Sequence, residues 1–405
     1  MLKRLRSCLS SIRIYFRLFI AWRKVIHYHI SDGHEEKILI IPCDPWSVVG
    51  SRGDQAMILA VKQHCGDAEI DILTDSHDVD GDCHDIGLNP IAEWNEPFEK
   101  WMKVKACRYE KVYILGADVT DGVYAWPVAM KLLMFYDCFS RIGKEVHYLG
   151  FSWSETPSPW MHLVFPLLKR QLPLPIRDPI SYKRVERFTR HRPLIQVADA
   201  AFKLKTNLTQ HAQYWIDWCR KKREEEQKVI AVNIHQMFNE EETKSEDWVI
   251  SFSKCLNEVV KSQRNITYLL IPHDNRPRVS DLEILKKLQL LLPNSTLIES
   301  VMNADEIKAI LGECDALIAG RMHISIAALG MGVPVLGLVY QGKFEGLWTL
   351  FKLSNDTLLT PKIFLDNHTK AIVVVNAFID NMKTLKEQIN KSLPSVLELS
   401  NHNYI

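Results

Sequence analysis

Apolar positions along this chain fall into short runs that alternate with longer segments of helical spacing. In the first half the runs are KILIIP (37–42), EIDILT (69–74), KVYILGAD (111–118) and EVHYLGFSW (145–153). Between them lie helix-compatible segments such as 53–65 and 124–143. Short runs that end in polar or glycine-rich turns, alternating with helices, are typical of a parallel α/β sheet.

A second series of the same kind begins at residue 228, with runs at 228–235, 266–274, 295–300, 315–320 and 333–340. A proline-rich passage (156–179) and a highly charged segment (219–227) separate it from the first. We therefore predict two doubly wound Rossmann-like domains facing a cleft, with the boundary at about 195–225. The predicted parts are an N-terminal helix (1–34), two α/β domains (35–195 and 225–365) and a C-terminal helical segment (366–405).

The first 30 residues follow a different pattern. Leu2, Leu5, Leu9, Ile12, Phe16 and Phe19 recur at three- and four-residue spacing, and no acidic residue precedes Asp32. A basic amphipathic helix with aromatic residues is the expected form of an interfacial membrane anchor. The alternatives are a helix packed on its own protein and a targeting segment. If residues 1–30 contact a membrane, they do so peripherally, because arginines interrupt the apolar run.

Composition narrows the function classes. A net charge of +1 gives no global field for nucleic acid, so no nucleic-acid partner is expected. Nine cysteines lack zinc-site spacing and suggest reduced thiols, which favours a cytoplasmic protein, at the inner membrane face if the helix is an anchor. Neither GxGxxG nor a P-loop is present. We expect no metal and no cofactor.

Polar residues follow the strands of the second series and are expected at one edge of its sheet. They are Asn233 and His235, His273 and Asp274, Gly320 with Arg321 and His323, and Tyr340 with Lys343. Arg321 and His323 precede a small-residue helix, whose N-terminus favours an anion. Arg321 adds a bidentate donor for phosphate or carboxylate. The alternative is that Arg321 pairs with a nearby carboxylate and His323 is a half-buried histidine.

Several of these residues resemble the motifs of the polysaccharide pyruvyl transferase family. The C-terminal motif comprises GRMH (320–323), Ala328, GVP (332–334), Tyr340 and Lys343. Arg177-Asp178 followed by Ser181, and DAAF (199–202), resemble upstream elements. Gly53-Asp54 resembles the N-terminal Gly-Asp turn. Ser51-Arg52 and Gly116-Ala117-Asp118 depart from the family pattern, which places the acceptor in doubt.

The resemblance implies a GT-B-like fold and transfer of the pyruvyl group of phosphoenolpyruvate onto two hydroxyls of one sugar. The product is a cyclic ketal, and phosphate is released. The acceptor is expected to be an exopolysaccharide sugar or its lipid-linked precursor. Implied donor contacts are Arg177, Arg321, His323, Lys343 and Tyr340. His235 is a further donor candidate because it follows a predicted strand. Of these, Arg321 and His323 are the catalytic candidates, and His323 binds phosphate or protonates the methylene carbon.

On the acceptor side the candidates are Gly53, Asp54, Asp118 and Tyr124, with Trp126 as a second aromatic that stacks on a sugar or packs in the core. Each charged candidate also has a structural alternative. Arg177 pairs with Asp178 or caps an element, Asp178 caps a helix, and Asp54 caps the helix that follows it. Two other functions stay open: a GT-B glycosyltransferase that uses a nucleotide sugar, and a non-catalytic protein of a polysaccharide pathway.

Overall fold

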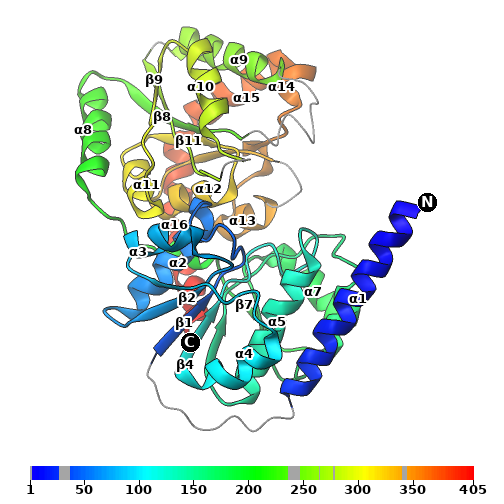
Figure 1. Cartoon of the computed structure of the whole chain (residues 1–405). Helices are drawn as coiled ribbons and strands as arrows, with labels where there is room; N and C mark the ends of the chain where they lie inside the picture. Colours follow the sequence, from blue (N-terminus) through cyan, green and yellow to red (C-terminus); the bar gives the residue numbers. More distant parts are fainter. Residues whose placement is uncertain (1, 27–36, 236–246, 264, 277–278, 340–343) are drawn as a thin grey trace. The chain divides into compact units, whose positions relative to one another are not determined.

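The computed structural model describes residues 2–26, 37–235, 247–263, 265–276, 279–339 and 344–405. Its chain divides into two compact units, seen in Figure 1 along the colour gradient of the sequence. The first unit contains residues 1–49, 61–200 and 401–405, and the second contains residues 50–60 and 201–400. Residues 50–60 are thus grouped with the second unit, and residues 401–405 with the first.

The first unit is built on a five-stranded parallel sheet of order β3-β2-β1-β4-β5. Its strands are β1 (Lys37–Ile41), β2 (Ile70–Leu73), β3 (Asn89–Ile91), β4 (Tyr109–Ile114) and β5 (Glu145–Tyr148). Leu39 of β1 pairs with Asp71 of β2 on one side and Val112 of β4 on the other. The order reverses between β1 and β4, which is the signature of a doubly wound sheet.

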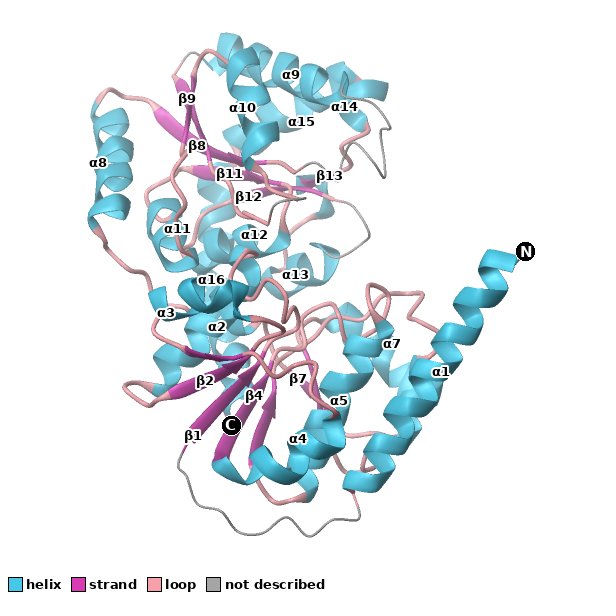
Figure 2. Cartoon of the chain, viewed as in Figure 1, coloured by secondary structure: helices cyan, strands magenta, loops and turns pink. Residues whose placement is uncertain are grey.

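Helices cover the strands of this sheet, as Figure 2 shows. They are α1 (Leu2–Val25), α3 (Asp80–Asp85), α4 (Phe98–Lys105), α5 (Trp126–Arg141), α6 (Met161–Val164), α7 (Pro179–Thr189) and part of α2 (Arg52–Cys65). A small parallel sheet of β6 (Leu174–Ile176) and β7 (Leu194–Gln196) extends the layer. No helix among the described residues is long and apolar enough to cross a membrane.

The second unit repeats the arrangement with six parallel strands in the order β10-β9-β8-β11-β12-β13. They are β8 (Lys228–Asn233), β9 (Ile266–Leu270), β10 (Ser295–Leu297), β11 (Ala316–Ala319), β12 (Val335–Leu338) and β13 (Leu358–Leu359). All the residues of β9, β11 and β12 are buried, which explains their unbroken apolar sequences. Two doubly wound domains of parallel strands are thus the architecture that the apolar pattern predicted.

Helices lie on both faces of the second sheet. They are α8 (Gln210–Glu224), α9 (Asp247–Gln263), α10 (Leu282–Leu291), α11 (Ala304–Leu311), α12 (Met322–Gly330), α13 (Phe344–Phe351), α14 (Ile363–Asp366), α15 (His368–Asp380) and α16 (Met382–Asn401). The core on the α9 and α15 face includes Trp248, Phe252 and Phe378. Helices α15 and α16 account for most of the segment that was predicted as a separate C-terminal part.

Candidate functional site

The sheet of the second unit reverses its order between β8 and β11, so the carboxyl ends of these two strands open at the topological switch point. His235, two residues beyond β8, is completely buried. Its Nε2 donates to the carbonyl oxygen of Gly320 at 3.1 Å, and the Gly320 N–H donates to the Asn233 carbonyl at 2.7 Å. The structure therefore shows His235 fixing the turn that follows β11.

Arg321 lies in this turn, at the N-cap of α12, and is held by two buried carboxylates. Its Nη2 is 2.7 Å from Oδ1 of Asp281, and its Nη1 is 3.1 Å from Oδ2 of Asp274. Nη2 also donates to the carbonyl of Val279 at 2.9 Å. The side chain is 13% exposed. The pairing with a nearby carboxylate, named above as an alternative, is thus present, and it fixes the guanidinium rigidly at the helix N-terminus.

Asp281 is the centre of this network, and sequence reasoning did not find it. Besides Arg321, its Oδ2 accepts from Asn233 Nδ2 and from the backbone N–H of His273, both at 3.0 Å. Although Asp281 occupies the N-cap of α10, its side chain makes no capping bond to that helix. Burial raises the pKa of Asp281, while the charge of Arg321 opposes the shift. In the sequence, an aspartate directly before an apolar helix looks like an ordinary N-cap, so the contacts of Asp281 with Arg321 and Asn233 could not be predicted.

His323 stands in the first turn of α12 and is half-buried. Its imidazole lies directly against Gly53, because a Cβ added at Gly53 would overlap Nδ1 and Cγ of His323. Gly53 belongs to the first turn of α2. The N-termini of α12 and α2 therefore meet at the imidazole, and each contributes the positive end of its helix dipole. Gly53 and Asp54, predicted on the acceptor side, lie in the same unit as the predicted donor residues His235, Arg321 and His323.

Residues 50–60 belong to the second unit because hydrogen bonds attach them to it. The Arg52 N–H donates to the His273 carbonyl at 3.2 Å, and the Asn275 N–H donates to the Gly50 carbonyl at 3.0 Å. Between these bonds, Ser51 and Asp274 form an antiparallel β-bridge. The buried Gln55 donates to the Asn303 side chain and accepts from the Ala304 N–H, both at 2.8 Å. Asn303 is the N-cap of α11. The start of α2 is thus fixed at two places.

Several positive groups lie around His273. His273 is buried, and burial is the main cause that lowers its pKa well below the ordinary value. The charges of His323, Arg321 and Arg52 lower it further. Arg52 is itself buried. His273 is therefore neutral at physiological pH, in a region where a bound anion would find several positive groups.

Arg177 lies in the first unit, where it is buried with Asp199. Its Nη1 is 2.8 Å from Oδ2 of Asp199, and its Nε donates to Oγ of Ser152 at 2.6 Å. Asp178 accepts from the Ser181 N–H at 2.7 Å and caps α7, as its structural alternative predicted. The partner of Arg177 is therefore Asp199, whereas the alternative had named Asp178.

The turn after β4 carries the predicted acceptor residues Asp118 and Tyr124. Asp118 is half-buried, and Tyr124 is exposed. Between them lies Asp121, a buried carboxylate that the sequence analysis missed. It accepts from the N–H groups of Val123 (3.0 Å) and Ser154 (3.1 Å), and burial raises its pKa, with a further contribution from Asp118. Trp126, the other aromatic candidate, stacks on Trp160 with ring centroids 4.5 Å apart.

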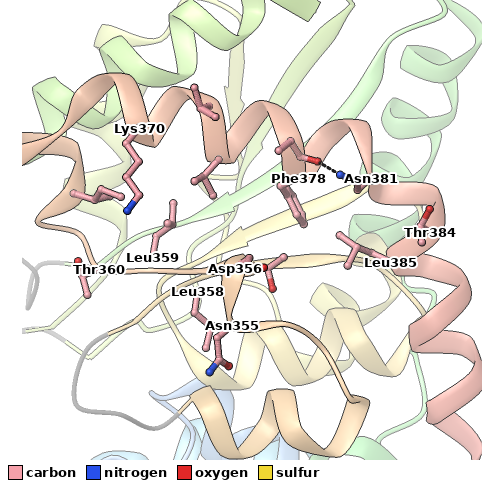
Figure 3. A pocket seen from close by; sticks show the side chains of 15 residues that line it. Asn355, Asp356, Leu358, Leu359, Thr360, Lys370, Phe378, Asn381, Thr384 and Leu385 are labelled. Carbon is pink, nitrogen blue, oxygen red and sulfur yellow. Dashed lines mark hydrogen bonds between the residues drawn. The ribbon is translucent and has the colours of Figure 1, made fainter.

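Two predicted donor residues, Tyr340 and Lys343, lie outside the described residues. A separate pocket of about 670 Å³ lies in the second unit beside β13, α15 and α16 (Figure 3). Leu358, Phe378 and Leu385 line it, with Lys370 and Asn381 among its polar residues. It contains none of the described residues proposed for the site. The switch point at Arg321 and His323 is therefore the candidate site of the second unit.

Solved structures with a similar fold include a glycosyltransferase from Rickettsia africae. It is 11% identical with a TM-score of 0.53, and the match covers 92% of this chain and 99% of that one. UDP-GlcNAc 2-epimerase from Neisseria meningitidis bound to UDP-GlcNAc gives 14% identity, a TM-score of 0.52 and coverages of 90% and 98%. UDP-GlcNAc 2-epimerase from Methanocaldococcus jannaschii is 11% identical with a TM-score of 0.55, and the match covers 84% of this chain and 92% of that one. These likenesses confirm the predicted GT-B-like fold.

A search of curated proteins found no match. A sequence model of the family described as polysaccharide pyruvyl transferase matches residues 52–342, which is well over half of the chain. The matched region begins at Arg52, the first residue of α2. It includes Arg321 and His323 at the N-terminus of α12. The chain is thus a transferase that belongs to the polysaccharide pyruvyl transferase family.

Proposed function

We propose that this protein transfers the pyruvyl group of phosphoenolpyruvate to two hydroxyls of one sugar of an exopolysaccharide or of a lipid-linked precursor. The observation that carries the proposal is the meeting of the α12 and α2 N-termini at His323. Arg52, Arg276 and Arg321 supply three positive charges there, beside the carboxylates Asp54, Asp274 and Asp281. Guanidinium groups held in fixed positions suit a donor that carries both phosphate and carboxylate.

In the proposed reaction His323 gives a proton to the methylene carbon of the donor, which becomes a methyl group. The adjacent carbon gains oxocarbenium character and is attacked by a sugar hydroxyl, which loses its proton. A second hydroxyl of the same sugar then forms the second C–O bond, and the C–O bond to phosphate breaks. Of the two hydroxyl protons, one replaces that lost by His323 and the other leaves with phosphate, so the reaction balances.

Arg321 has a positioning and electrostatic role in this proposal. Because Asp281 and Asp274 hold its guanidinium, its charge is already fixed at the helix N-terminus before the donor arrives. Preorganised charge stabilises a transition state without reorganisation during the reaction. Arg177, Tyr340 and Lys343 stay proposed donor contacts, and Asp118 and Tyr124 stay proposed acceptor contacts. The carboxylate of Asp54, at the start of α2, is proposed to orient an acceptor hydroxyl.

The test is incubation of the purified protein with phosphoenolpyruvate and a panel of oligosaccharides, followed by mass spectrometry and a phosphate assay. We expect one oligosaccharide to gain a ketal-linked pyruvate with one equivalent of phosphate. His323→Ala should lower the rate about a hundredfold or more. The matched control is His211→Ala on the exposed face of α8, which should keep the wild-type rate.

Transfer of a sugar from a nucleotide sugar, with no transfer from phosphoenolpyruvate, would contradict this proposal and show that the protein is a glycosyltransferase. Equal rates for His323→Ala and His211→Ala would remove His323 from the reaction. Retained glycan binding with no turnover from either donor would favour a non-catalytic role.

A further inference from the structure

Helix α1 has apolar residues on two faces, and the described part of the protein covers one of them. On the inner face Trp22 and Val25 are buried, where α1 packs on α4 and α5. Trp22 Nε1 also donates to Oδ2 of Asp137 in α5 at 2.9 Å. On the outer face lie Leu9 (59% exposed), Ile12 (38%), Phe16 (55%) and Ile20 (51%). Their spacing of three, four and four residues makes one continuous exposed stripe.

The charges that α1 itself carries beside this stripe have a single sign. Arg13, Arg17, Arg23 and Lys24 are exposed on the same half of the helix. No acidic residue occurs in positions 1–31, so the helix itself provides no compensating charge. Lys24 is paired with Glu99 of α4 at 3.0 Å, which leaves the arginines as the main source of positive charge around the stripe. An apolar stripe bordered by arginines is complementary to a surface that is apolar beneath and anionic above.

A groove of about 720 Å³ runs along α1 in the first unit. Arg17 and Ile20 line one side of it, and Trp46, Trp94 and Lys131 line others. Trp46 is 53% exposed, whereas Trp94 is buried and has the ammonium of Lys131 4.0 Å from its ring centroid. Glu96 and Glu99 also line the groove. An exposed indole is a side chain that membrane interfaces favour, because the ring is amphipathic.

We propose that the outer face of α1 docks in the plane of an anionic phospholipid bilayer, with Leu9, Phe16 and Ile20 among the acyl chains and the arginines at the lipid phosphates. The 24 residues of α1 extend about 36 Å along the surface. The buried inner face keeps the helix attached to the first unit during docking. This inference is independent of the proposed reaction, since binding is measured without any substrate.

The experiment is co-sedimentation of the full-length protein with vesicles of phosphatidylcholine, with and without 30% phosphatidylserine. We expect pelleting with the anionic vesicles that weakens strongly from 0.1 M to 0.5 M salt, since salt screens charges at this range. Phe16→Ser/Ile20→Ser should abolish pelleting. Arg13→Glu/Arg23→Glu should weaken it by about fivefold or more for each cation replaced.

Matched controls come from exposed residues of the second unit. Leu290→Ser/Val301→Ser removes comparable apolar surface, and Lys221→Glu/Lys254→Glu reverses two exposed charges. Both should pellet like the wild type. All variants should keep the wild-type thermal midpoint, because the altered side chains are exposed. Truncation of α1 is unsuitable, since it would uncover the residues that pack on Trp22.

Three results would overturn the proposal: no pelleting of the wild type, equal pelleting with neutral vesicles, or unchanged pelleting of Phe16→Ser/Ile20→Ser. Concentration-dependent dimerisation that this variant abolishes, without vesicle binding, would assign the stripe to a second copy of the chain instead.

Discussion

At the scale of single residues, the pair formed by Arg321 and Asp281 sets the geometry of the site. A guanidinium shared by two buried carboxylates has little freedom to follow a ligand. The network also passes through Asn233 and the backbone of His273, so it joins the ends of β8, β9 and β11. Removing one member of a buried pair leaves an uncompensated charge, which costs more than the pair contributes when intact.

Replacing Asp281 with Ala should lower the free energy of unfolding by about 3 kcal/mol, because Arg321 then loses its main partner in a buried place. Urea denaturation measures the change. The matched control is Arg276→Ala, which removes a partly exposed cation that pairs with Asp274. It should cost under about 1 kcal/mol. Similar losses in the two variants would show that Asp281 is not the centre of the network.

The sequence identified Arg321 and His323 because a charged pair after an apolar strand is unusual and matches a family motif. It did not identify Asp281 or Asp121. Both sit where aspartate is common, before a helix or inside a turn, and only the tertiary fold shows that their carboxylates face distant partners. Likewise Gly53 was assigned by its place in the chain to the acceptor side, whereas its contacts lie with His323.

At the scale of elements, the site depends on how closely α2 approaches α12. A helix can begin against an imidazole only if its own first turn has no side chain at the point of contact. Gly53 meets that condition, and Gln55 holds the same turn to the N-cap of α11. Glycine therefore fits at the Gly-Asp turn because a side chain at position 53 would overlap His323. The sequence motif alone does not show this contact.

Gly53→Ala should destabilise the protein by about 1–3 kcal/mol, because the new methyl group overlaps His323. In a His323→Ala background the same change should cost much less, since the overlaps with Nδ1 and Cγ are gone and only the Cβ of residue 323, 3.0 Å away, remains close. Thermal and urea denaturation of the four proteins in this cycle give the coupling energy. Gly81→Ala is the control, because a Cβ there meets nothing within 4 Å. A cost that is the same in both backgrounds would place the clash elsewhere.

Most strands of both sheets were predicted, because each is a compact apolar run with a turn behind it. The exceptions are β3, whose three residues Asn89–Ile91 include a proline and no apolar run, and β13, which has only the two residues Leu358–Leu359. Each is defined by its pairing with a neighbouring strand, β2 and β12 respectively, which no local pattern reveals. Helix α1 was predicted as amphipathic, but its division into a packed face and an exposed face depends on α4 and α5.

At the scale of the whole molecule, acid should weaken the fold through His273. In the unfolded chain this histidine titrates near pH 6.5. Its folded pKa lies well below that value, so below about pH 6.5 the unfolded chain binds a proton that the folded protein excludes. Stability is then fully present above pH 6.5 and falls as the pH drops, by up to about 1.4 kcal/mol per unit.

The measurement is the thermal midpoint between pH 8 and pH 5, for the wild type and for His273→Gln. We expect the midpoint of the wild type to fall below pH 6.5 and the slope in the variant to be shallower. An unchanged slope in the variant would assign the acid sensitivity to another group.

The membership of residues 50–60 in the second unit has a consequence for synthesis. These residues leave the ribosome long before residues 273–323, which they contact. At roughly 5–20 residues per second, the delay between Arg52 and its partner His273 is on the order of 10–40 s. During that time the start of α2 has no partner surface. A fragment that begins at residue 201 would never receive that turn, so adding a peptide of residues 50–60 in trans should stabilise it.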